Sequence, residues 1–139
     1  MTRLIASLQH TIKPMDKLVS IRGAITVNEN SVKEIKVATK SLVGEIFKQN
    51  KLDQPGIINI IFTVTEDLDA INPATVTREQ FKLDSTAMLC VQEMKMKNGL
   101  PKCIRVLINA YTNISKDKIK HVYLGNAESL RTDLGKSIS

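Results

Sequence analysis

The sequence predicts an α+β fold: a single domain with a mixed β-sheet and helices on one face. Three observations lead to this prediction. Two segments carry helix-start signals, and the first continues with apolar residues at helical spacing. Five segments read as strands separated by turn signals. The chain of 139 residues, 42% of them hydrophobic, is long enough to bury a core. The expected order is β-α-β-α-β-β-β.

The first half of the chain predicts a strand, a helix and a second strand. The first strand is expected over 18–27, where Gly23 permits a close approach of neighbouring atoms. Ser31 and Glu34 have the spacing of a capping box, which opens a helix that continues to about Asn50. The run 57–65, which follows a Pro-Gly turn, is almost continuously apolar and β-branched. It is therefore expected to be a central strand buried on both faces.

The second half predicts a short helix and three more strands. Asn72 is a typical N-cap, and Pro73 suits the first helical position. The Asn98-Gly99 pair and Pro101 form a turn between two of the strands. These last three strands are expected over 86–93, 102–112 and 119–124.

Residues 1–20 differ from the rest of the chain. They carry Arg3, Lys13 and Lys17 against the single acid Asp16, a net charge of +2, and they are rich in hydroxyl side chains. This composition fits either a short arm that packs on the domain or part of a targeting segment. We therefore divide the chain into an N-terminal extension (1–20), one domain (21–134) and a C-terminal tail (135–139).

Composition argues against several classes of function. The net charge is +6, but the lysines are spread along the chain and aromatic residues are only 4%, which disfavours nucleic-acid binding. Neither the two cysteines nor the two histidines have zinc-ligand spacing, so no structural zinc site is expected. No apolar run reaches the ~20 residues that span a bilayer, so no membrane partner is expected. We expect a cytoplasmic protein with reduced thiols, or a plastid protein if 1–20 is part of a targeting segment.

Arginine is the most suggestive residue type. Four of the five arginines lie beyond the first twenty residues, at Arg22, Arg78, Arg105 and Arg131. The guanidinium fork suits carboxylates, so these residues predict a site for a small dianion. The chain has no GxSxG elbow and no glycine-rich phosphate loop. Such a set of residues suits binding and electrostatic catalysis better than covalent chemistry.

Six motifs, in order and at matching spacing, resemble the monofunctional chorismate mutases of the trimeric bacterial AroH class. The resemblance runs from Ile21 to about Leu134 without a gap. The motifs are Ile21-Arg22-Gly23-Ala24-Ile25-Thr26-Val27, Thr65-Glu66-Asp67-Leu68-Asp69-Ala70 with Pro73-Ala74, Cys90-Val91-Gln92-Glu93-Met94, Lys102-Cys103-Ile104-Arg105-Val106, His121-Val122-Tyr123-Leu124 and Leu130-Arg131-Thr132-Asp133-Leu134.

The resemblance implies an isomerase that converts chorismate to prephenate without a cofactor, as a homotrimer of pseudo-α/β-barrel form with sites between subunits. It implies that Arg105 faces the ether oxygen whose bond breaks, and that Arg22 and Tyr123 bind the side-chain carboxylate. It assigns Glu93 and Cys90 to the ring hydroxyl, and Arg78 of a neighbouring subunit to the ring carboxylate. It also implies that Ala74, Leu130 and Arg131 take part in substrate binding.

One geometric expectation, two departures from the family and one alternative function accompany this interpretation. Cys90 and Glu93 would point to opposite faces of a regular strand, so we expect an irregularity at Gln92-Glu93. Asn72 and Leu89 depart from the family, in which Phe and a small or polar residue are common at these positions. The alternative function is a trimeric module that binds a small anion without turning it over.

Overall fold

The structure is a computed structural model and describes residues 15–130. Arg131 and most of the N-terminal extension lie outside the described residues, and the division into 1–20, 21–134 and 135–139 stays a prediction. The element order is the expected β-α-β-α-β-β-β. Its members are β1 (Lys17–Thr26), α2 (Val32–Asn50), β2 (Ile57–Val64), α3 (Pro73–Phe81), β3 (Ala87–Gln92), β4 (Cys103–Thr112) and β5 (Val122–Leu124), joined in part by the 3₁₀ turns η1 (Gln54–Gly56), η2 (Lys116–Lys118) and η3 (Gly125–Leu130).

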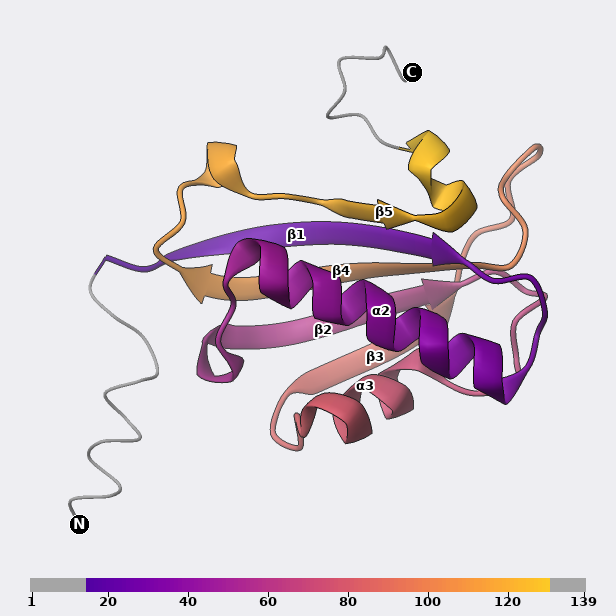
Figure 1. Cartoon of the computed structure of the whole chain (residues 1–139), viewed down its shortest axis with the longest axis horizontal. Coiled ribbons are helices and arrows are strands. Elements are labelled where there is room, and N and C mark those ends of the chain that lie inside the picture. The colour runs from indigo at the N-terminus through magenta and orange to yellow at the C-terminus, as the bar shows by residue number, and fades with distance from the viewer. Residues whose placement is uncertain (1–14, 131–139) are drawn as a thin grey trace.

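The five strands form one mixed sheet in the order β3-β2-β4-β1-β5. β4 pairs antiparallel with β1 and β2, whereas β3 and β5 run parallel to their neighbours β2 and β1. Both helices lie on the same face of this sheet, as Figure 1 shows. The predicted α+β architecture is confirmed, and the other face of the sheet carries no α-helix within residues 15–130.

Local signals define both helix starts. The Ser31 hydroxyl accepts a hydrogen bond from the Glu34 amide at 3.1 Å, while the Glu34 carboxylate reaches back to the amide of Asn28 at 3.0 Å. The Asn72 side chain likewise accepts from the Ala74 amide at 2.8 Å, with Pro73 at the first helical position. Asn72, the departure from the family pattern, therefore has a structural role here as a helix cap.

The core lies between the helices and the sheet. It is built from alternate residues of the strands, such as Ile21, Ile60, Phe62 and Ile108, all 0% exposed, and from the inner face of α2. Gly23 of β1 lies close to α2, since a Cβ atom there would stand 2.8 Å from the Ile46 side chain. The predicted close approach at Gly23 is confirmed.

One prediction about the sheet is wrong. β2 is an interior strand between β3 and β4, as expected, but it is buried on the helix-covered face only, and β4 is the middle strand of the sheet. The opposite face of β2 carries the half-buried Asn59, Ile61 and Thr63. An apolar, β-branched run does not distinguish a strand covered on both faces from one whose second face is left half-open.

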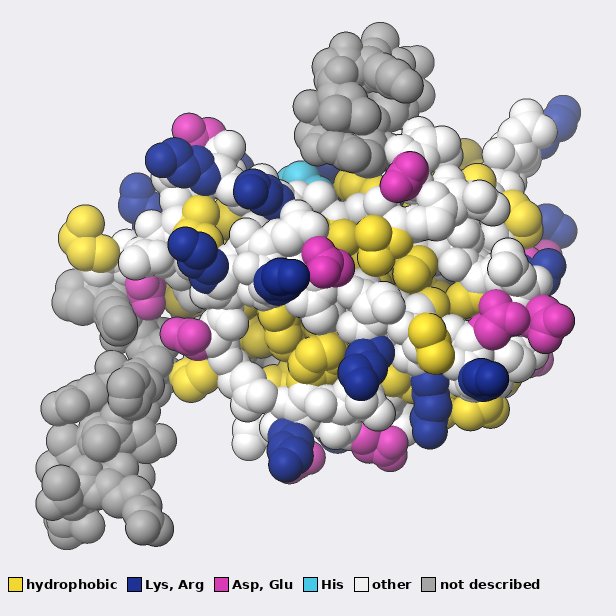
Figure 2. Space-filling model, in the orientation of Figure 1, with side chains coloured by type: hydrophobic (Ala, Val, Ile, Leu, Met, Phe, Trp, Pro, Cys, Tyr) yellow, Lys and Arg dark blue, Asp and Glu magenta, His cyan; other side chains and the backbone are white. Residues whose placement is uncertain are grey.

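The helix-covered surface shows no concentrated patch of positive charge. On this face, which Figure 2 displays, the lysine and arginine side chains are dispersed among hydrophobic and neutral ones. No helix of the described part of the chain is long and apolar enough to cross a membrane.

Candidate active site

The helix-free face of the sheet gathers most of the predicted chemistry. Cα pairing places Arg105 beside Ala24 of β1 and Thr63 of β2, and places Tyr123 beside Ala24 from the other side. Residues paired in this way share a face, and Arg22 shares it because it is two residues from Ala24. Together these strands carry a cavity of 540 Å³, within the range of small-molecule sites.

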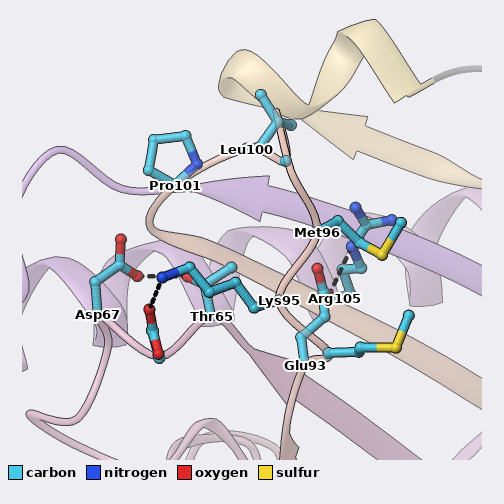
Figure 3. Close-up of a pocket in the computed structure, with 11 residues that line it drawn as sticks. Thr65, Asp67, Glu93, Lys95, Met96, Leu100, Pro101 and Arg105 are labelled. Carbon is cyan, nitrogen blue, oxygen red and sulfur yellow. Dashed lines mark hydrogen bonds and ion pairs between the residues drawn. The ribbon is translucent and has the colours of Figure 1, made fainter.

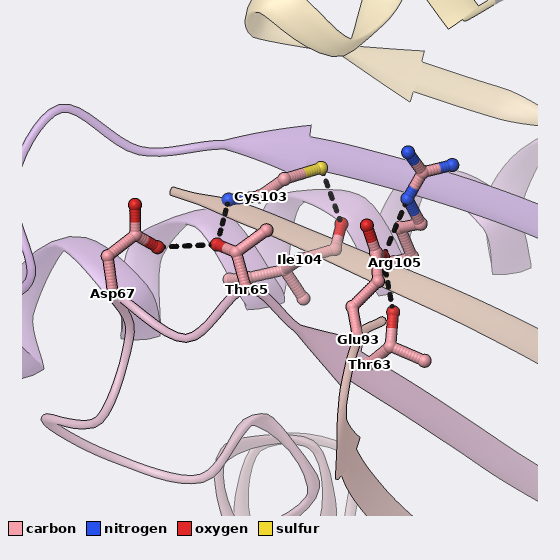
Figure 4. Close-up of polar contacts among 7 residues, drawn as sticks. All are labelled: Thr63, Thr65, Asp67, Glu93, Cys103, Ile104 and Arg105. Carbon is pink, nitrogen blue, oxygen red and sulfur yellow. Dashed lines mark hydrogen bonds and ion pairs between the residues drawn. The ribbon is translucent and has the colours of Figure 1, made fainter. Parts of the chain in front are cut away.

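Arg105 and Glu93 form an ion pair at the floor of this cavity (Figure 4). Arg105 Nε lies 2.8 Å from Glu93 Oε1, and the two side chains are 39% and 22% exposed. The contact is an ion pair without an aligned hydrogen bond, because Nε has no hydrogen-bond partner of acceptable angle among the described residues. The terminal guanidinium nitrogens point away from Glu93, as Figure 4 shows.

Glu93 is held from a second side. The Thr63 hydroxyl donates a hydrogen bond of 2.8 Å to the same Oε1 atom, and the Glu93 amide donates to the Val64 carbonyl at 2.8 Å. Thr63, the residue paired with Arg105, was not among the candidates from the sequence. A hydroxyl residue inside an apolar run was its only signal.

A smaller cavity of 210 Å³ opens beside the first and shares Glu93, Met94, Met96 and Arg105 with it. Figure 3 shows its wall, formed by the segment after β3 and by the loop after β2. Met94 and Met96, both exposed, were also missed by the sequence analysis. In the sequence these methionines alternate with the charged residues Glu93, Lys95 and Lys97, which gave no distinctive pattern.

The loop after β2 anchors the start of β4. The Thr65 hydroxyl accepts from the Cys103 amide at 3.0 Å and donates to the Asp67 carboxylate, which also accepts from the Lys102 amide at 3.0 Å. This network lies two residue pairs along from Thr63 and Arg105, and Figure 4 shows its contacts among Thr65, Asp67 and Cys103. It therefore keeps the ends of β2 and β4 in register next to the ion pair.

The far wall of the cavity comes from β1 and β5, and η3 packs against these two strands. Tyr123 is half-buried and, with Leu130, packs against a small buried cluster of Ala24, Cys103 and Ala127. The Arg22 amide donates to Nδ1 of His121 at 2.9 Å, which ties the start of β5 to β1. The Arg22 side chain is exposed and lines the cavity.

Three predicted site residues lie elsewhere within one copy of the chain. Ala74 and Arg78 are on α3, and Cys90 packs against the core on the helix-covered face, beside Phe62. β3 does end at Gln92, but the amide of Glu93 still pairs with β2, so alternation continues and Cys90 and Glu93 point to opposite faces. The expectation that an irregularity brings them to one ligand is wrong within a single copy.

Burial affects both cysteine thiols in the same direction. Burial raises the pKa of the Cys90 thiol, and burial raises that of the Cys103 thiol to about 11, although Arg105 nearby opposes the shift. Cys103 is 0% exposed, as expected for a structural residue. No group of three or more His, Cys, Asp or Glu side chains in residues 15–130 is arranged to hold a metal ion.

Comparisons with known proteins show the family of the chain. Residues 18–134 match the model of the family described as chorismate mutase type I. The chain belongs to the type I chorismate mutase family. It is 38% identical over 114 residues to chorismate mutase AroH of Bacillus subtilis (strain 168), which covers 82% of this chain and 90% of that protein.

Two further relatives support the membership. Chorismate mutase AroH of Thermus thermophilus is 38% identical over 115 residues, 82% of this chain and 93% of that protein. A solved chorismate mutase from Clostridium thermocellum superposes with a TM-score of 0.76 at 44% identity, covering 79% of this chain and 97% of that one. The chain therefore has the fold of a type I chorismate mutase, and the family resemblance expected from its motifs is confirmed.

Proposed function

We propose that this type I chorismate mutase converts chorismate to prephenate, as an isomerase of aromatic amino acid biosynthesis. Membership of the family supports the proposal, and so does one observation in the site: a half-buried arginine paired with a glutamate on the floor of a cavity of 540 Å³. This arrangement offers a positive and a negative charge side by side to one small ligand.

The reaction is a Claisen rearrangement. The bond between the ring and the ether oxygen breaks while the methylene carbon of the enolpyruvyl group bonds to the ring, and no atom or proton leaves the molecule. Negative charge grows on the ether oxygen and positive charge on the ring. A cation at Arg105 and an anion at Glu93 stabilise both developing charges in the transition state more than in the ground state.

The remaining groups bind the two carboxylates of the substrate. Arg22 and Tyr123 take the side-chain carboxylate, because an exposed guanidinium and a phenol line the same cavity as Arg105. Arg78 takes the ring carboxylate, Leu130 and Ala74 form apolar wall, and Cys90 contacts the ring hydroxyl. Arg131 supports the site from the C-terminal end of the domain.

We infer that two copies of the chain build each site, in a homotrimer. Within one copy, Arg22, Glu93, Arg105 and Tyr123 line the cavity, whereas Arg78 lies on α3. One ligand can contact the four cavity residues of one copy and Arg78 of a second copy when α3 of the second copy packs against the open face of the sheet. Ala74 and Cys90, also away from the cavity, then arrive with Arg78.

The edge strand β3 supports such packing. It presents Leu89, 64% exposed, and Val91, 48% exposed, on the open face of the sheet. An apolar edge strand invites pairing with another chain unless a partner covers it. The apolar Leu89, which departs from the family pattern, fits a position covered by a neighbouring copy.

The expected compartment is the cytoplasm. Cys90 and Cys103 are free thiols on opposite faces of the sheet, which suits a reducing environment.

An assay of chorismate decides the proposal. Purified protein is mixed with chorismate, the fall in chorismate absorbance is followed, and the product is identified as prephenate. Turnover to prephenate supports the enzyme. Saturable binding of chorismate without turnover would instead favour the trimeric anion-binding module.

A further inference from the structure

Thr63 occupies a distinctive place in the site. It lies on β2 with its Cα paired to that of Arg105, and its side chain points to the open face of the sheet. Its hydroxyl donates at 2.8 Å to Oε1 of Glu93, the same oxygen that lies 2.8 Å from Arg105 Nε. The two contacts converge on one oxygen from two strands, as Figure 4 shows, and so define the tilt of the carboxylate.

Glu93 needs such a contact because its own segment does not hold the side chain. Glu93 follows the last residue of β3, and the exposed Met94 and Lys95 come directly after it. Its backbone amide is bonded to Val64, which places the Cα atom but leaves the side-chain torsions open. Fixing a glutamate side chain costs rotamer freedom that must be offset by specific contacts.

The ion pair with Arg105 does not by itself fix the orientation of the Glu93 carboxylate. Arg105 Nε is close to Oε1 but has no aligned hydrogen bond among the described residues, so their attraction depends on distance more than on angle. A hydroxyl donor on a β-branched residue of an interior strand is a stiffer support, because its χ1 torsion is restricted.

We propose that Thr63 is a positioning residue, whose hydroxyl holds the Glu93 carboxylate beside Arg105 before substrate binds. The proposal rests on the proposed mutase function. Thr63 acts through Glu93, and its effect is on the placement of the negative charge that the transition state requires. Preorganised groups need no rearrangement at the moment of reaction, whereas a displacement of about 1 Å can cost up to about 100-fold in rate.

Two substitutions separate the hydroxyl from the shape of the side chain. Thr63→Val keeps the volume and the β-branch and removes the donor, so it suits a strand. Thr63→Ser keeps the donor and loses the methyl group. We expect Thr63→Val to lower kcat by roughly 10- to 100-fold with a much smaller change in KM, and Thr63→Ser to restore most of the turnover.

A double-mutant cycle with Glu93→Ala tests whether Thr63 acts through Glu93. Adding Thr63→Val to Glu93→Ala should cause no further loss of kcat, because the group being positioned is already gone. The matched control is Thr65→Val, the same change two residues along the chain. The Thr65 hydroxyl contacts the Cys103 amide and Asp67 and not Glu93, so its effect on kcat should persist in the Glu93→Ala background.

A crystal structure of Thr63→Val gives a readout that does not depend on turnover. We expect the Glu93 carboxylate to leave its place beside Arg105. Full kcat in Thr63→Val, or an equal loss with and without Glu93, would overturn the proposal. If the wild-type protein fails to convert chorismate, the proposed function is wrong. In that case the crystal structure of Thr63→Val still tests the positioning role of Thr63. A Glu93 carboxylate that keeps its place beside Arg105 would refute that role.

Discussion

Replacement of Arg105 by alanine should reduce turnover far more than it weakens substrate binding. Arg105 is the one described arginine in contact with Glu93, and its side chain is 39% exposed, so an effective dielectric near 20 is appropriate. A unit charge at about 4 Å from a fully developed unit charge is then worth about 4 kcal/mol, and about 2 kcal/mol if half a charge develops. Removal of a donor aimed at a developing oxyanion costs about 2.7–4 kcal/mol in enzymes generally. We therefore expect Arg105→Ala to lower kcat by roughly 100- to 1,000-fold.

The assay is steady-state turnover of chorismate, with kcat and KM determined separately. Arg105→Lys should recover only part of the loss, since an ammonium on a flexible stem does not reproduce the guanidinium fork. Arg22→Ala is the matched comparison. Its target carboxylate is charged in the ground state and the transition state alike, so much of its loss should appear in KM.

Circular dichroism and sedimentation must show that each variant is folded and keeps the assembly of the wild type. Near-normal kcat in such an Arg105→Ala protein would refute the electrostatic reasoning. The assignment of the chain to the family would stand, but the role proposed for Arg105 would not.

Three further predictions concern pH and the N-terminus. Turnover should be nearly flat from about pH 6 to 9, because the rearrangement transfers no proton; a limb near neutrality would show that a titrating group takes part and would contradict the electrostatic account. Burial raises the pKa of the Cys103 thiol from 9.0 to about 11. The stability that the buried, protonated thiol contributes to the folded state is therefore intact below about pH 9 and is lost as the pH rises through 11. Urea unfolding should show this loss, on the order of 2 to 3 kcal/mol, relative to Cys103→Ala, in which it should be absent. Deletion of Met1 to Lys17 should leave turnover nearly unchanged, since it removes one residue pair of β1, Lys17 with Thr112; unfolding or loss of most activity would contradict this.

Local chemistry explains which parts of the fold were predictable from the sequence. Ser31 and Asn72 mark helix starts because their side chains bond to amides two or three residues away. Strand pairing depends instead on residues far apart in the chain, such as Thr63 and Arg105. The order of the sheet, with β4 at its centre, was therefore not contained in any local pattern.

The candidate site divides in the same way. The motifs indicated Arg22, Glu93, Arg105 and Tyr123, and all four line one cavity. Thr63 was missed because a threonine in a strand is ordinary, and its meaning comes only from the oxygen that it contacts. Cys90 could not be assigned to a face from its spacing to Glu93 alone, since the outcome depended on whether β3 stayed regular.

The central claim is that this chorismate mutase has sites built from two copies of the chain, and subunit mixing tests it most directly. Arg105→Ala and Arg78→Ala remove groups that are proposed to meet one substrate from different copies. Each variant alone should have little activity. The two are mixed, unfolded in urea and refolded together, and each variant refolded alone is the control.

In a closed trimer, a mixed assembly contains one site that has both arginines. Three of every four randomly formed trimers are mixed, so turnover of chorismate should recover to about a quarter of the wild-type rate. Recovery near this level, with prephenate as the product, is the result we predict. If the co-refolded protein is trimeric and mixed, yet no more active than either parent, the two arginines do not meet in a shared site and the account is contradicted.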